Sequence, residues 1–151
     1  MNTPASTARE RPIDILMVDD NPGDVRLARE ALYEGKIRNN LQVAGDGIEA
    51  LALLRGNGSD IAAFRPDLIL IDLNMPRMDG RQLLAILKSD DRFKRIPMVV
   101  MTSSRAEEDV VKSYNLHANC FITKPVDLDQ MIRIVRNIES FWIELVTLSP
   151  Q

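Results

Sequence analysis

Short apolar runs alternate with amphipathic stretches along the chain. The apolar runs, five or six residues each, predict strands at 13–18, 41–45, 67–72, 97–102 and 118–123. Apolar residues recur at helical spacing between and after these runs, which predicts helices at 24–34, 48–54, 80–88, 106–114 and 128–145. Five strand–helix units in succession predict an α/β fold, a doubly wound five-stranded parallel sheet with right-handed crossovers.

Local signals agree with this pattern. The runs at 67–72 and 97–102 are almost entirely apolar, which suits parallel strands covered on both faces. Asp127, with Gln130 three residues later, predicts a capping box at the start of the last helix. Asp46 and Gly47 predict a tight exit from the second strand, with Asp46 also placed to start the next helix.

The composition is that of one globular domain. The 151 residues are 45% hydrophobic and 27% charged, and the net charge of −3 argues against general affinity for nucleic acid or anionic membrane. One Cys excludes an internal disulfide, and one Cys with one His excludes a dense His/Cys metal site. No apolar run approaches the roughly 20 residues that span a bilayer. We expect a cytoplasmic protein with a disordered polar leader at 1–12, one domain at 13–145 and a tail at 146–151.

Polar side chains stand at the ends of four predicted strands. In wound parallel sheets, ligands bind at the carboxyl ends of the strands, where the winding reverses. We expect five residues at that edge: Asp19 and Asp20 after the first strand, Asp72 at the end of the third, Thr102 at the end of the fourth and Lys124 after the fifth. The sequence therefore predicts a site of three carboxylates, one hydroxyl and one ammonium.

These groups together suit phosphoryl chemistry. Three clustered carboxylates repel one another, so the site needs a cation or must take up protons, and hard oxygen ligands favour Mg²⁺. Lys124 supplies a compact positive charge and Thr102 a short hydrogen-bond donor for phosphoryl oxygens. A carboxylate can be the nucleophile that forms an acyl phosphate, and Asp72, on the central strand, is best placed for that role. Asp19 and Asp20 would then serve the metal.

Four motifs, in this order and spacing, resemble the receiver domain of two-component response regulators: MVDDNPGD, LIDLNMPRMDG, VVMTSS and FITKP. The resemblance covers about 13–140 and implies a flavodoxin-like receiver fold with strand order 2-1-3-4-5. It also implies that Asp72 accepts phosphate from the phosphohistidine of a sensor histidine kinase. The implied Mg²⁺ ligands are Asp20, Asp72 and the main-chain carbonyl of Asn74, with Asp19 at the family's outer acidic position.

The same resemblance assigns the remaining positions. Thr102 and Lys124 would grip the phosphoryl oxygens. Phe121 occupies the switch position, where an aromatic ring turns inward as Thr102 moves toward the phosphate; many relatives have Tyr there, so Phe121 keeps the ring without the hydroxyl. Asn74 and Ser104 lie where receivers tune the rate of self-dephosphorylation.

A narrower resemblance rests on YNLHANCFITKP, on IESFWIELVTL and on the long loop before the third strand. These stretches are similar to the single-domain response regulators of bacterial and cyanobacterial phytochromes, which implies a red-light-sensing kinase as phosphodonor and a homodimer. Ile134 and Phe141 widen the apolar stripe of the last helix beyond one core contact. A dimer contact through the last helix and last strand therefore stands beside simple core packing.

Ordinary structural explanations exist for several of these residues. Asp19 and Asp20 could be helix-capping acids, and Lys124 could be a surface lysine in a turn. His117 is expected to pack or hydrogen-bond rather than to act in catalysis, and Cys120 to be a small apolar filler.

Three rival functions fit less of the sequence. A haloacid-dehalogenase-type hydrolase wants a second Asp two residues after Asp72, where this chain has Asn74. A flavodoxin-like FMN binder needs a first loop that attracts phosphate, which the acidic pair would repel. A receiver that serves only for docking would not need all five key positions filled. We therefore expect a stand-alone response regulator, not an enzyme beyond its own phosphorylation and dephosphorylation, that signals through altered protein association.

Overall fold

The computed structural model describes residues 12–56, 64–75, 77–113, 120–124 and 127–148. Strands and helices alternate, in the order β1 (Ile13–Val18), α2 (Pro22–Tyr33), β2 (Asn39–Ala44), α3 (Gly47–Arg55), β3 (Leu68–Asp72), α4 (Gly80–Ser89), β4 (Met98–Thr102), α5 (Arg105–Ser113), β5 (Cys120–Thr123) and α6 (Leu128–Leu148). Every element expected from the sequence is present. The start of the last predicted strand, 118–119, lies outside the described residues.

Several predicted boundaries differ from the observed ones by one to three residues. The largest difference at a helix end is in the last helix, which continues to Leu148, three residues beyond the end expected at 145. The sequence explains the extension, because no Gly or Pro interrupts it until Pro150, and the residue before a proline is disfavoured in a helix. Among the described helices, none combines the length and the apolar character that crossing a membrane requires.

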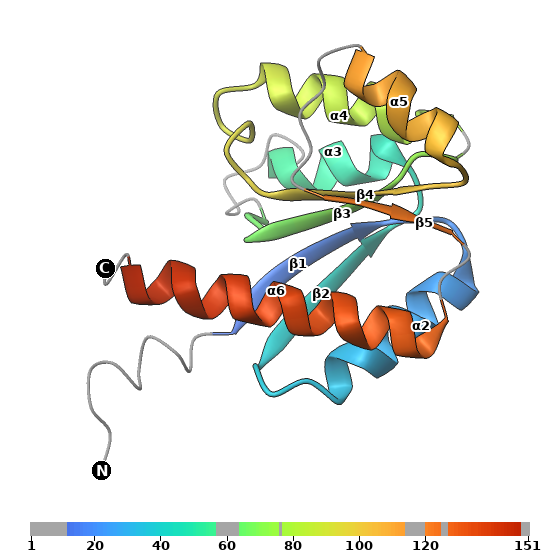
Figure 1. Ribbon diagram of the computed structural model, residues 1–151. Helices are drawn as coiled ribbons and strands as arrows, with labels where there is room; N and C mark the ends of the chain where they lie inside the picture. Colours follow the sequence, from blue (N-terminus) through green and yellow to red (C-terminus); the bar gives the residue numbers. More distant parts are fainter. Residues whose placement is uncertain (1–11, 57–63, 76, 114–119, 125–126, 149–151) are drawn as a thin grey trace.

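The five strands form one parallel sheet in the order β2-β1-β3-β4-β5, as predicted. Val18 at the end of β1 pairs with Ala44 of β2 and with Ile71 of β3, so these strands end at one edge of the sheet. Helices α3, α4 and α5 cover one face, and α2 and α6 cover the other (Figure 1). The fold is therefore doubly wound.

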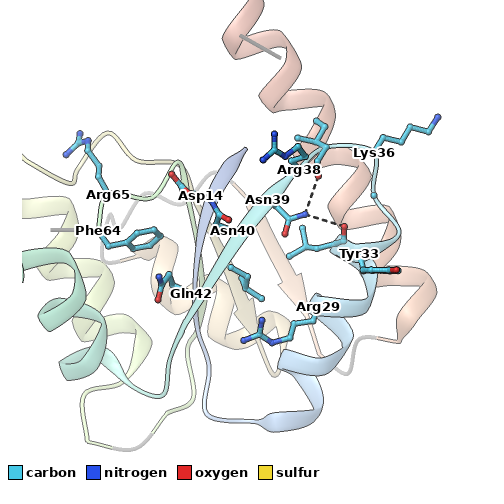
Figure 2. A pocket seen from close by; sticks show the side chains of 14 residues that line it. Asp14, Arg29, Tyr33, Lys36, Arg38, Asn39, Asn40, Gln42, Phe64 and Arg65 are labelled. Carbon is cyan, nitrogen blue, oxygen red and sulfur yellow. Dashed lines mark hydrogen bonds between the residues drawn. The ribbon is translucent and has the colours of Figure 1, made fainter. Parts of the chain in front are cut away.

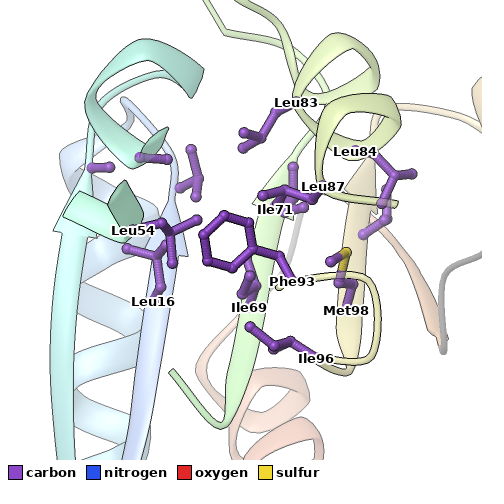
Figure 3. Packing of buried hydrophobic residues seen from close by; sticks show 14 of the residues in the cluster. Leu16, Leu54, Ile69, Ile71, Leu83, Leu84, Leu87, Phe93, Ile96 and Met98 are labelled. Carbon is purple, nitrogen blue, oxygen red and sulfur yellow. The ribbon is translucent and has the colours of Figure 1, made fainter. Parts of the chain in front are cut away.

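Alternate side chains of the central strands enter two cores. Ile69 and Ile71 point into the core under α3 and α4, whereas Leu68 and Leu70 point into the core under α2 and α6. Figure 3 shows the first core, where the ring of Phe93 lies among apolar side chains from the sheet and from α3 and α4. Burial on both faces fixes β3 rigidly, and β3 carries the predicted acceptor at its end.

Both helix starts predicted from the sequence are confirmed. The Asp46 carboxylate accepts a hydrogen bond from the Glu49 main-chain N–H at 2.9 Å and caps α3. The Asp127 carboxylate accepts from the Gln130 N–H at 2.8 Å, and the Gln130 side chain accepts from the Asp127 N–H at 2.9 Å. These caps fix where the loops at the carboxyl edge of the sheet end.

Candidate functional site

The carboxyl ends of the strands bring the predicted acidic residues together. Asp19 follows β1, where its main-chain N–H donates to the Ala44 carbonyl at 2.9 Å, and Asp72 is the last residue of β3. One carboxylate oxygen from each of Asp19, Asp20 and Asp72 lies within 4.8 Å of the others. Asp19 and Asp72 are buried, with 1% and 2% of their surface exposed, whereas Asp20 is exposed. The cluster thus has an open side.

Lys124 enters this cluster from the end of β5. Its Nζ lies 2.9 Å from Asp72 Oδ2 and 3.4 Å from Asp19 Oδ2, and it also pairs with Asp24. Its main-chain N–H donates to the Thr102 carbonyl at 2.7 Å, which holds the end of β5 against β4. Only 20% of the side chain is exposed, so Lys124 is not a surface lysine.

Asp24 is a member of the site that the sequence analysis did not single out. It lies in the first turn of α2, and Asn21, which caps this helix, accepts its main-chain N–H at 3.2 Å. The available signal was its place at the end of the MVDDNPGD motif, one helical turn beyond the acidic pair. This signal is weak, because the helix dipole alone also favours an acid in a first turn.

The electrostatics of the cluster leave it short of positive charge. Burial, together with a hydrogen bond to Asp24 and the charge of Asp72, raises the pKa of Asp19 to about 7. Burial disfavours the Lys124 ammonium, but its hydrogen bonds to Asp24 and Asp72 outweigh this and raise its pKa. Four carboxylates around one ammonium retain negative charge, and their hard oxygens fit a divalent cation such as Mg²⁺. Asp19, Asp20 and Asp72 are the residues that would hold it.

Thr102 ends β4 beside the cluster and is fully buried. Its Oγ1 has no hydrogen-bond partner among the described residues. A buried hydroxyl left in this way costs about 1–3 kcal/mol, so its presence calls for an explanation. A ligand on Asp72 with acceptor oxygens would supply the missing partner.

The loop after β3 lies close against the acceptor strand. The Asn74 main-chain N–H donates to Asp72 Oδ1 at 3.0 Å, and the Gly80 N–H donates to the Leu73 carbonyl at 3.2 Å. A Cβ at Gly80 would lie 2.4 Å from the Asp72 carbonyl oxygen, so only glycine fits there. The metal-ligand role expected for the Asn74 carbonyl stays a prediction.

Arg77 fixes the far end of this loop, and the sequence analysis gave it no role. Its backbone is left-handed, with φ of 60°. Its guanidinium forms an ion pair with Asp46, whose carboxylate is buried, and its Nε donates to Asp46 Oδ2 at 2.6 Å. The Gly47 N–H donates to the Met78 carbonyl at 3.2 Å. The loop that follows the acceptor is therefore tied to the start of α3.

The predicted switch residue, Phe121, is half-buried on β5 beside Val100 of β4. Its ring packs against the core under α3 and α4, and the Lys112 Nζ lies 5.3 Å from the ring centroid. Cys120, expected as an apolar filler, is instead exposed, because β5 is an edge strand and this residue lines an open groove between β5 and α6. His117 lies outside the described residues.

A large depression of the described surface lies elsewhere. About 920 Å³ in size, it runs along the free edge of β2, with Arg29, Lys36, Arg38 and Arg65 around it (Figure 2). None of the predicted site residues lines it. Volume therefore does not locate the chemistry, whereas the convergence of carboxylates, ammonium and hydroxyl does.

The chain is also similar to known proteins. Residues 15–136 match the model of the response regulator receiver domain. The chain is 46% identical to response regulator Rcp1 of Synechocystis sp. over 137 residues, which cover 91% of this chain and 93% of Rcp1.

Two solved structures are also similar. The crystal structure of the phosphorylated cyanobacterial phytochrome response regulator RcpA is 48% identical, with a TM-score of 0.76 over 87% of this chain and 94% of that one. The Mn²⁺-bound form of Rcp1 is 45% identical, with a TM-score of 0.75 over 88% and 96% of the two chains.

Proposed function

The chain belongs to the response regulator receiver domain family and is related to phytochrome response regulators, and from that premise we propose that it accepts a phosphoryl group on Asp72 in an Mg²⁺-dependent reaction. Receiver domains take phosphoryl groups from histidine kinases. The proposal rests on the environment of Asp72. Lys124 Nζ lies 2.9 Å from Asp72 Oδ2, and the buried Thr102 hydroxyl has no partner among the described residues.

The transfer is a displacement at phosphorus. An oxygen of the Asp72 carboxylate attacks, the new P–O bond forms as the P–N bond to the donor imidazole breaks, and the imidazole leaves with the electron pair of that bond. Lys124 offsets the charge on the phosphoryl oxygens, and the Thr102 hydroxyl donates a hydrogen bond to one of them. Mg²⁺, held by Asp19, Asp20, Asp72 and the Asn74 carbonyl, would neutralise further charge, and the Mn²⁺-bound form of Rcp1 supports a divalent ion there.

Loss of the phosphoryl group follows the same chemistry with water. A water oxygen attacks phosphorus and the bond to the Asp72 oxygen breaks. Inorganic phosphate leaves with the protons of the water, and the free carboxylate is restored. The chain acts in this way on itself alone, so it is a signalling protein rather than an enzyme with an external substrate.

The proposed phosphodonor is a phytochrome-type sensor kinase. The support is the similarity to RcpA and Rcp1, each at more than two fifths identity over nearly its whole length. Transfer from a purified autophosphorylated bacteriophytochrome kinase should be complete within minutes, whereas an unrelated chemotaxis kinase at equal concentration should transfer far more slowly. Equal rates from both donors would contradict the phytochrome assignment.

We also propose that signalling proceeds through a homodimer formed by β5 and α6. A shallow apolar groove of about 200 Å³ lies between these elements, with Ile122 and Ile134 among its lining residues. Phe141 of α6 stands at this groove with 41% of its surface exposed, a large apolar side chain that a second copy could cover.

The phosphorylation proposal is tested by intact mass after incubation with acetyl phosphate. The wild-type chain with Mg²⁺ should gain the mass of one phosphoryl group, and omission of Mg²⁺ or the change Asp72→Asn should abolish the gain. Circular dichroism of Asp72→Asn checks that the fold is retained. A phosphoryl gain by folded Asp72→Asn would contradict the assignment of the acceptor.

A further inference from the structure

A hydrogen-bonded group beside the acceptor centres on Glu107, in the first turn of α5. One carboxylate oxygen, Oε1, accepts from the Ser103 main-chain N–H at 2.6 Å and from Asn74 Nδ2 at 3.2 Å. Asn74 Nδ2 also donates to Ser103 Oγ at 2.7 Å. These three residues, the Glu107 clasp, join the loop after β3 to the loop after β4.

The Glu107 clasp borders the group that is proposed to be phosphorylated. Asn74 follows Asp72 by two residues, and its main-chain N–H donates to Asp72 Oδ1 at 3.0 Å. Ser103 directly follows Thr102, whose buried hydroxyl lacks a partner among the described residues. Two N–H donors next to the acceptor are thus already engaged by an internal carboxylate.

A phosphoryl group on Asp72 would need those donors. It carries two negative charges and accepts several hydrogen bonds, and an N–H that points at Glu107 cannot fully serve it as well. The Glu107 carboxylate also adds negative charge where the incoming phosphoryl group is negative. We propose that Glu107 is a positioning residue that holds Asn74 and Ser103 in the unphosphorylated arrangement and opposes phosphorylation, an inference that rests on the proposed function.

Helix capping alone would also place an acid here. Ser104 Oγ accepts the Glu107 main-chain N–H at 3.3 Å, the contact of an N-cap with the third helical residue. Capping predicts an effect on stability only. The next residue provides a matched control, because Glu108 instead pairs with Lys112 at 2.9 Å, and within the described part of the chain its side chain makes no hydrogen bond to Asn74 or Ser103.

The test measures the rate constant of phosphorylation by acetyl phosphate and Mg²⁺ for the wild-type chain, Glu107→Gln, Glu107→Ala and Glu108→Gln. Release of charge-assisted hydrogen bonds should make both Glu107 variants about tenfold faster, and Glu108→Gln should match the wild type. The gain should persist at high salt, because screening weakens repulsion of the anionic donor more than it weakens a short hydrogen bond.

Two readouts separate positioning from capping. A lower thermal midpoint of Glu107→Gln fits either role, because the carboxylate also joins two loops by hydrogen bonds, whereas faster phosphorylation of the same variant fits positioning alone. The Ser103 amide resonance should shift when the wild type is phosphorylated, and should already be shifted in unphosphorylated Glu107→Ala. A wild-type chain that takes up no phosphate would contradict the proposed function itself. A wild type that is phosphorylated no more slowly than folded Glu107 variants would overturn this inference alone.

Discussion

Among the described residues, Thr102 has the environment that is hardest to explain without a ligand, because its hydroxyl is buried. Every other buried polar side chain at this edge has a charged or main-chain partner, Asp19 and Asp72 with Lys124 among them. Thr102 Oγ1 has none among the described residues. An uncompensated hydroxyl is retained at a cost to stability, which is the pattern expected where a side chain serves a ligand rather than the fold.

Thr102→Val should therefore stabilise the unphosphorylated protein. Valine keeps the shape of threonine and removes the buried hydroxyl, so the free energy of unfolding should rise by about 1–2 kcal/mol. The same variant should be phosphorylated more slowly, because one donor to the phosphoryl oxygens is lost. Urea denaturation and the acetyl phosphate assay measure the two effects. Thr102→Ser, which keeps the hydroxyl, is the control, and a Thr102→Val protein less stable than the wild type would refute the argument.

Arg77 combines an unfavourable backbone conformation with a favourable side-chain ion pair. A left-handed non-glycine residue costs roughly 1 kcal/mol, and the ion pair with buried Asp46 offsets it. Arg77→Ala loses the pair and keeps the strain, whereas Arg77→Gly loses the pair and the strain together. We expect both variants to be less stable than the wild type, with Gly more stable than Ala by about 1 kcal/mol. Equal stability of the two variants in urea would show that the loop does not impose the left-handed backbone.

Asp46 links this loop to acid stability. Its hydrogen bond from the Glu49 main-chain N–H, and then its contacts with Arg77, hold the pKa of its carboxyl below the ordinary value of 3.8, although burial acts in the opposite direction. The unfolded chain then binds this proton more readily than the folded chain. The resulting stabilisation is complete above pH 3.8 and is lost as the pH falls through the lower folded value.

Replacement of Asp46 by Asn removes this titration and keeps an oxygen for the cap. The free energy of unfolding of Asp46→Asn should fall less steeply with decreasing pH below about 4 than that of the wild type. Urea titrations at a series of pH values measure the slope. Parallel curves for the two proteins would mean that Asp46 does not carry this part of the acid dependence.

At the scale of elements, α6 has two apolar sides with different surroundings. Met131, Val135 and Trp142 are buried in the core under α2 and α6. Phe141 instead lies at the groove with β5, while Ile143, also exposed, lines a cleft toward the loop after α2. Core packing alone therefore leaves one face of the helix uncovered.

The two exposed residues give a matched pair for the dimer proposal. Phe141→Glu should weaken self-association by at least about 30-fold, because a central aromatic contact is worth roughly 2 kcal/mol or more. Ile143→Glu, with the same charge introduced on the same helix, should leave self-association unchanged. Sedimentation equilibrium of the phosphorylated and unphosphorylated chains measures both. A stronger effect of Ile143→Glu would move the interface to the other side of α6.

Sequence patterns predicted the helices and strands and most of the residues at the carboxyl edge of the sheet. Both can be predicted because they depend on the order of residues within short segments. Apolar runs and caps fixed the strands and helix starts, and strand ends delivered Asp19, Asp72 and Thr102 to one edge. The missed features depend on contacts between segments far apart in the chain. The pairing of Asp24 with Lys124 spans 100 positions, and that of Arg77 with Asp46 spans 31. No periodicity within one segment carries such information.

In the molecule as a whole, the fold connects the carboxyl edge of the sheet, where Asp72 lies, to the surface formed by β5 and α6. Asp72 lies at the carboxyl edge of the sheet, with Thr102 and Phe121 on the neighbouring strands β4 and β5. The proposed dimer surface is formed by β5 and α6, so β5 belongs to both the predicted switch and the proposed interface. A change at the acceptor therefore has a short path to altered association, as a two-state switch requires.

The central claim is that Asp72 is the phosphoryl acceptor. The most direct measurement phosphorylates the full chain, reduces the acyl phosphate with borohydride and maps the modified peptide by mass spectrometry. Reduction converts only a phosphorylated carboxylate to an alcohol, so it marks the acceptor residue itself. We predict the alcohol at Asp72 and at no other position, and only when phosphodonor and Mg²⁺ are both present. An alcohol at Asp19, Asp20 or Asp24 instead would contradict the account.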